Sequence, residues 1–132
     1  MLGLVPAACA GSAKRDAARL VGEMDRYRRA DDASRPEQAR RIEALACGDP
    51  SVCDAKRACV AAVRTTARAF ELKDEVARRL ADVEAKRLAP DAPEAQALPG
   101  KLDEARRLLV EGRTGMADCE RQLTDLRVRL GV

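Results

Sequence analysis

The sequence contains no histidine and no tryptophan, and its aromatic residues are limited to Tyr27 and Phe70. Histidine is the commonest general base and a common ligand of zinc and copper, so its absence removes the usual centre of acid–base and metal chemistry. The shortage of aromatic residues also removes the side chains that stack on nucleic-acid bases. We therefore predict that the protein is not an enzyme and has no catalytic, cofactor-binding or metal-binding residues.

The sequence also lacks a strong excess of charge and a long apolar run. Its 25 basic and 22 acidic residues leave a formal net charge of +3. Proteins that bind nucleic acid usually carry a larger or more segregated basic excess. No segment is apolar for long enough to cross a bilayer. We expect neither a nucleic-acid partner nor a membrane-spanning helix.

What the sequence does contain is alanine and charge. Hydrophobic residues make up 46% of the chain, but many of them are alanine, and charged residues make up 36%. Alanine favours helix and buries little area per residue, so the core must be thin. A thin core favours long helices packed side by side, and the sequence predicts an all-α fold.

Two turn sequences divide the chain, GDPS at 48–51 and LAPDAPE at 88–94. Glycine, proline and aspartate at these points are typical of helix ends. Ser51 and Asp91 are expected to cap the helices that follow, each with an acidic residue three positions later.

Three segments of nearly equal length remain, at 12–47, 52–88 and 92–130. Equal helices joined by short turns predict an antiparallel up-down-up three-helix bundle of long, coiled-coil-like helices. Pro36 lies inside the first segment, which is therefore either one kinked helix or two pieces.

The last two segments carry apolar stripes with steps of three and four residues. The stripe of the last segment is Leu102, Ala105, Leu109, Gly112, Met116, Cys119, Leu123, Leu126 and Leu130. The stripe expected to be buried in the middle segment is Cys59, Val63, Thr66, Phe70, Ala77, Leu80 and Val83, interrupted by Lys73.

The first eleven residues, MLGLVPAACAG, are apolar and small, and form a segment separate from the bundle at 12–132. Pro6-Ala7-Ala8-Cys9 resembles the lipobox of bacterial lipoproteins, in which the cysteine becomes the acylated first residue. The resemblance implies an export signal whose start lies upstream, and a lipid anchor on Cys9. Cleavage after Ala10 would instead give a soluble exported protein, and a disordered N-terminus would suit a cytoplasmic one.

The other cysteines, Cys47, Cys53, Cys59 and Cys119, are even in number, as a disulfide framework requires. Residues that face each other in a helical hairpin are equidistant from its turn. Cys47 and Cys53 are centred on residue 50, and Cys59 and Cys119 on residue 89, which are the two turns expected above. We therefore predict the disulfides Cys47–Cys53 and Cys59–Cys119.

Zinc binding and free thiols are the alternatives for these cysteines. Structural zinc sites usually bring their cysteines in closely spaced pairs, two to four residues apart, and the spacing here is wider. Reactive thiols favour a C-x-x-C pair or a basic surrounding. Both alternatives match the spacing less well than two crosslinks do.

Taken together, these patterns predict a non-enzymatic, exported helical module in the periplasm or cell envelope. It would bind another envelope protein through a helix face, and would touch the membrane only through a lipid on Cys9. The alternative is a cytoplasmic coiled-coil protein with reduced cysteines, which oligomerises or binds a thiol-seeking metal.

Overall fold

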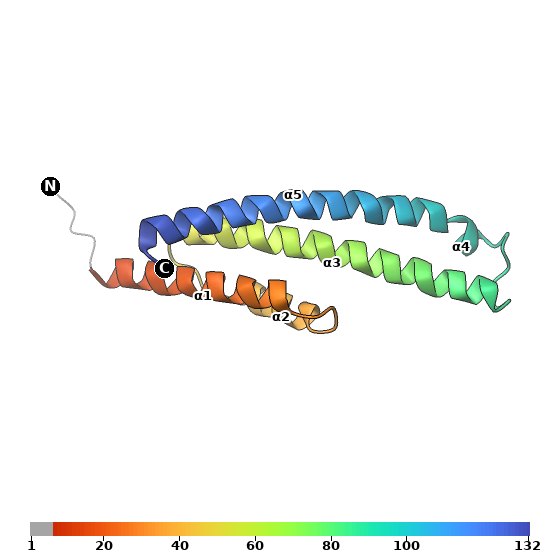
Figure 1. The fold of residues 1–132 in the computed structure, drawn as a ribbon, viewed down its shortest axis with the longest axis horizontal. Helices are drawn as coiled ribbons and strands as arrows, with labels where there is room; N and C mark the ends of the chain where they lie inside the picture. The colour runs from red at the N-terminus through yellow and green to blue at the C-terminus, as the bar shows by residue number, and fades with distance from the viewer. Residues whose placement is uncertain (1–6) are drawn as a thin grey trace. The chain divides into compact units, whose positions relative to one another are not determined.

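The computed structural model describes residues 7–132, with side chains from residue 11 onward, and this part of the chain contains helices and no β-strand. The all-α prediction is confirmed. Figure 1 labels the helices, whose bounds are α1 Ala7–Arg29, α2 Arg35–Glu43, α3 Pro50–Glu84, α4 Pro93–Gln96 and α5 Leu98–Leu130. Over the described residues, none of these helices is both long and apolar enough to cross a membrane.

The chain forms two compact units. Unit 1 contains the described residues up to Val63 together with Gly115–Val132, and unit 2 contains Arg64–Thr114. The helices α3 and α5 each contribute one part to unit 1 and one part to unit 2.

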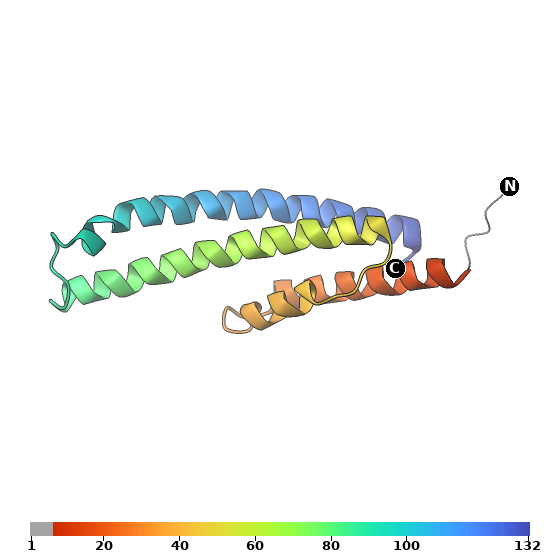
Figure 2. The same cartoon turned by 180° about the vertical axis from the view of Figure 1, so that it is seen from behind.

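In unit 1 the expected first helix is two helices. The α1 helix ends at Arg29, and α2 starts at Arg35 with Pro36 in its first turn, where a missing backbone N–H costs nothing. The two helices lie against each other in both views (Figures 1 and 2). Gln38 fixes this contact, because its Nε2 donates to the backbone oxygen of Glu23 at 3.1 Å and also to the Glu23 carboxylate.

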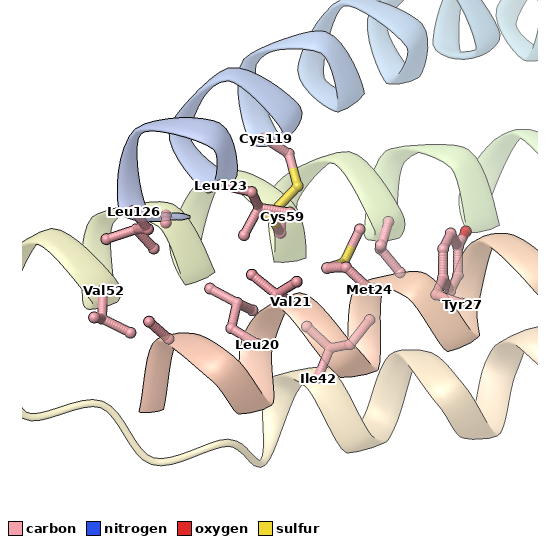
Figure 3. Packing of buried hydrophobic residues seen from close by; sticks show 13 residues of the cluster. Leu20, Val21, Met24, Tyr27, Ile42, Val52, Cys59, Cys119, Leu123 and Leu126 are labelled. Carbon is pink, nitrogen blue, oxygen red and sulfur yellow. A yellow bond between two sulfur atoms is a disulfide. The ribbon is translucent and has the colours of Figure 1, made fainter. Parts of the chain in front are cut away.

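The core of unit 1 draws apolar side chains from α1, α2, α3 and α5 (Figure 3). Leu20 and Met24 of α1 are almost completely buried, as are Ile42 of α2 and Leu126 of α5. Arg35 covers one side of this core, with its guanidinium carbon 5.9 Å from the ring centre of Tyr27. Burial raises the pKa of Tyr27, an effect that the nearby Arg35 charge partly opposes.

Unit 2 contains a pair of helical segments, one from α3 and one from α5, joined through α4. Its buried apolar residues are Ala69, Leu72, Val76, Leu98 and Ala105. The two helices lie close together at Gly112, where an added Cβ would lie 2.6 Å from Thr66 Oγ1. A larger residue at this position would therefore require the Thr66 side chain to move, whereas the Thr66 backbone nitrogen, at 3.5 Å, would be in ordinary contact.

The helix ends differ from the expected caps. The helix α3 starts at Pro50, and its cap is Asp49, not Ser51: Asp49 Oδ1 accepts from the backbone N–H of Ser51 at 2.9 Å. The expected cap at Asp91 is also wrong, because α4 begins after Ala92 without a side-chain cap. Proline is the first residue of α4, at Pro93, and the second residue of α5, at Pro99, where its fixed backbone angle suits the first turn of a helix.

The end of α3 is defined by Lys86, which adopts a left-handed conformation with φ of 61°. The backbone N–H groups of Arg87 and Leu88 both bond to the carbonyl of Asp82, at 2.8 and 3.1 Å. This pattern satisfies a free carbonyl of the last helical turn. The helix therefore ends at Glu84, four residues before the expected end at Leu88.

Candidate functional site

The structure places the four cysteines in the two expected pairs. The Cα atoms of Cys47 and Cys53 are 5.3 Å apart, and those of Cys59 and Cys119 are 4.7 Å apart. Both distances suit a disulfide. The Cys59–Cys119 bond links α3 to α5 inside the core of unit 1 (Figure 3).

The Cys47–Cys53 disulfide joins the α2–α3 loop to the first turn of α3. Two further contacts hold this loop. Lys56 Nζ donates to the carbonyl of Leu45 at 2.7 Å, and the backbone N–H of Gly48 donates to Asp16 at 3.2 Å. The hydrogen bonds of Ser51 lower the pKa of Asp49, the residue that caps α3. The loop is therefore fixed at several points besides the disulfide.

No group of histidine, cysteine, aspartate or glutamate in the described part of the chain is arranged to hold a metal ion. The proposed lipidation residue Cys9 lies in the first turns of α1, and its side chain is outside the described residues. Pro6 and the residues before it are outside them as well.

Unit 2 presents the second candidate site, an apolar surface at one side of its helix pair. On the other side, Lys101 Nζ pairs with Glu75 Oε1 at 2.5 Å. Leu80 is 48% exposed although it belongs to the stripe expected to be buried. Phe70, Leu102 and Leu109 are each only partly buried.

We define the open face by two stripes with helical spacing. The α3 stripe is Phe70, Lys73, Ala77 and Leu80, and the α5 stripe is Leu102, Arg106, Leu109 and Arg113. The two stripes meet at an apolar depression of about 360 Å³ that both Leu80 and Leu102 line. Both stripes therefore border the same surface of unit 2.

The border of the open face is basic. Lys73, Arg106 and Arg113 are all exposed, and Val110, 60% exposed, lies between the two arginines along α5. Asp103, at the same border, lies 3.7 Å from the Arg106 guanidinium, and Glu84, which is exposed one turn after Leu80 on α3, also offsets part of this charge. An apolar strip with positive edges is suited to bind a helix with an apolar stripe and negative edges.

The periodicity identified the residues of this face but assigned them to the core. The α3 residues actually buried in unit 2 are Ala69, Leu72 and Val76, and they lie on a neighbouring stripe. A helix that packs against one neighbour buries one stripe, and α3 carries apolar residues on two. The pattern alone therefore could not tell which of the two would be covered.

No protein-family model matches this chain, and the comparisons with curated proteins and with solved structures found no match. Proposals about function therefore rest on the geometry described above.

Proposed function

We propose that this chain is an exported, non-enzymatic helical module that binds another protein of the cell envelope through the open face of unit 2. One observation carries the proposal: unit 2 leaves a second apolar stripe uncovered, with Leu80 48% exposed. Large apolar side chains that gather at a basic border are typical of a binding surface.

The expected partner is an amphipathic helix with leucine-like residues on one stripe and acidic residues beside it. Its apolar residues would fill the depression beside Leu80 and Leu102, and its carboxylates would pair with Lys73, Arg106 and Arg113. A second copy of the same face would bring basic residues against basic residues, which costs free energy. An acidic partner therefore fits better than self-association.

The direction of the helices in each unit is part of the proposal. In unit 1, Cys59 pairs with Cys119 and Ala62 lies near Gly115. In unit 2, Thr66 lies near Gly112 and Glu75 pairs with Lys101. Residue numbers rise along α3 as they fall along α5, which supports an antiparallel pair in each unit.

In unit 1, Arg28 pairs with Glu120 and Arg127 with Asp25, which supports α1 antiparallel to α5 and therefore parallel to α3. Because α2 turns back along α1, these contacts favour an up-down-up-down order of α1, α2, α3 and α5 in unit 1 over the expected up-down-up order of three helices.

Two features support the export part of the proposal. Two disulfides suit an oxidising compartment, whereas cytoplasmic thiols are usually kept reduced. The lipobox-like sequence that ends at Cys9 would supply the lipid anchor. The alternative, a cytoplasmic coiled-coil protein, requires four reduced cysteines.

Position-specific photo-crosslinking in the native host tests the binding face. A photoreactive residue replaces Leu80 on the open face and, as the matched control, Glu71, which is exposed on another side of α3. We expect a discrete crosslinked protein from position 80 and none from position 71. The identified partner should contain an acidic amphipathic helix, and the double variant K73E/R113E should abolish the crosslink. Equal products from both positions, or a partner without such a helix, would reject the open face.

The mass of the intact protein purified from the same host tests export separately. We expect a lipid-sized increase on a chain that begins at Cys9, together with a mass lower by four hydrogen atoms because the four other cysteines form two disulfides. A chain that starts after Ala10 with both disulfides would retain export and remove the lipid. A full-length chain with every thiol free would contradict export.

A further inference from the structure

The two disulfides lie in very different surroundings. Cys59 and Cys119 are each 0% exposed, inside the apolar core of unit 1. Cys47 and Cys53 are only partly buried, and Cys47 lies in the loop before α3. Thiol–disulfide exchange requires the attacking sulfur to reach the bond in line, so accessibility decides which bond reacts.

The position of Cys53 also affects its chemistry as a leaving group. It lies in the first turn of α3, where the partial positive charge of a helix N-terminus stabilises a thiolate. Lys56 follows one turn later and adds a positive charge on the same side of the helix. Cys47 has no such helix, because α2 ends at Glu43. Attack on the Cys47 sulfur, which releases Cys53, is therefore the favoured direction.

We infer that Cys47–Cys53 is a thiol–disulfide exchange site for a dithiol reductant, and that Cys59–Cys119 stays oxidised during the exchange. This inference does not depend on the open face, because every residue it uses belongs to unit 1.

The exchange has two steps. A thiolate of the reductant attacks Cys47 Sγ, the Cys47–Cys53 bond breaks, and its electron pair goes to Cys53 as a thiolate. The second thiol of the reductant then loses its proton to water and attacks the reductant sulfur that is bonded to Cys47. This attack releases Cys47 as a thiolate, which takes a proton from water. The dithiol is oxidised to a disulfide, and the protein gains two electrons.

The fold tolerates this reaction, because the loop has other attachments. Lys56 still holds the carbonyl of Leu45, and Ile42 keeps α2 in the core at 0% exposure. The bond closes a sequence separation of only 6 residues, against 60 for Cys59–Cys119. Reduction therefore removes one attachment of the loop, keeps the hydrogen bond from Gly48 to Asp16, and leaves the rest of unit 1 packed.

Timed reduction of the full chain tests the site. Free Cys9 is first blocked with iodoacetamide without reductant. Dithiothreitol is then added, samples are quenched with N-ethylmaleimide, and peptide mass mapping locates the label. We expect Cys47 and Cys53 to be labelled at least about tenfold faster than Cys59 and Cys119, with unchanged helical circular dichroism. Labelling of both pairs at one rate, or of Cys59 and Cys119 first, would overturn the inference.

Two further measurements test which disulfide gives the fast labelling phase and which of its sulfur atoms is attacked. The variant C47S/C53S should lose the fast labelling phase and retain the slow one; a fast phase that remains would contradict the assignment. A single-thiol reductant, glutathione, should stop at the mixed disulfide, and mapping should find it on Cys47. Glutathione on Cys53 would reverse the assigned direction of attack.

Discussion

Unit 1 and unit 2 use the same two long helices but are stabilised differently. Unit 1 packs four helical segments around one apolar cluster and contains both disulfides. Unit 2 pairs one segment of α3 with one of α5, and its buried side chains are few and mostly small. Where a third and a fourth helix contribute, apolar stripes of α3 and α5 are covered; where they do not, one stripe stays open. The uncovered stripe of unit 2 is what a partner would complete.

The largest effect on stability should come from the buried crosslink of unit 1, which unit 2 lacks among its residues 64–114. Replacing both Cys59 and Cys119 with serine should lower the free energy of unfolding by about 4 kcal/mol, because the bond closes a long loop in the unfolded chain. The matched variant C47S/C53S should lose about 2 kcal/mol, because its loop is short. Urea unfolding at equilibrium measures both. Equal losses would mean that loop length does not govern their contributions.

Close helix approach in unit 2 is tested at its glycine. Gly112→Ala would place a Cβ 2.6 Å from Thr66 Oγ1 and should lower the free energy of unfolding by about 1–3 kcal/mol. Gly100→Ala, where no atom lies within 4 Å, should instead raise it by about 0.5–1 kcal/mol. Adding Thr66→Ala to Gly112→Ala should recover part of the loss. An unchanged free energy of unfolding in Gly112→Ala would show that the side chains of unit 2 rearrange around the added methyl group at no cost.

The contact between α1 and α2 is tested at a buried amide. Gln38→Ala removes two hydrogen bonds to Glu23 and should cost about 1 kcal/mol in unfolding free energy. Gln96→Ala in unit 2 is the control, because that side chain is exposed while it bonds to the carbonyl of Pro90. Its effect should stay within about 0.5 kcal/mol. Similar costs at both positions would argue against a special role of Gln38 in holding α2.

The smallest effect should come from the ion pair of unit 2. The hydrogen bond from Lys101 lowers the pKa of Glu75 below its ordinary value of 4.5. A lowered pKa stabilises the fold above pH 4.5, and this contribution is lost as pH falls through the folded-state pKa. Glu75→Gln should therefore reduce stability slightly at pH 7 and have less effect at pH 3. Thermal unfolding at both pH values measures this, and a pH-independent difference would exclude the pair as its cause.

Much of this architecture follows from the sequence because turns and spacings are local signals. Residue 89 centres the turn between α3 and α5 even though Asp91 is not the cap and α3 ends earlier than expected. The spacing of Cys59 and Cys119 about that centre does not depend on which residue starts or ends the helix. For this reason, errors in the helix ends leave the pairing unchanged.

The features that could not be predicted from the sequence depend on how the helices pack against one another. Pro36 fits a kinked helix as well as the start of a new one, and the choice depends on whether α2 packs against α1. In the same way, Phe70 and Leu72 lie on different stripes of α3, and each would suit a core. The position of α5 decides that Leu72 is covered and that Phe70 lies at the open face.

The bond between Cys59 and Cys119 also determines how the chain carries tension. If the protein is held at its N-terminus and pulled at its C-terminus, the force passes from Cys59 to Cys119 through the sulfur atoms. The residues between them, 60–118, bear no load and add nothing to the extended length until the bond is reduced. About 200 Å of chain would be released at that moment, at roughly 3.4 Å per residue. Unit 2, with its open face, would thus remain folded and available to a partner while the ends of the chain are stretched.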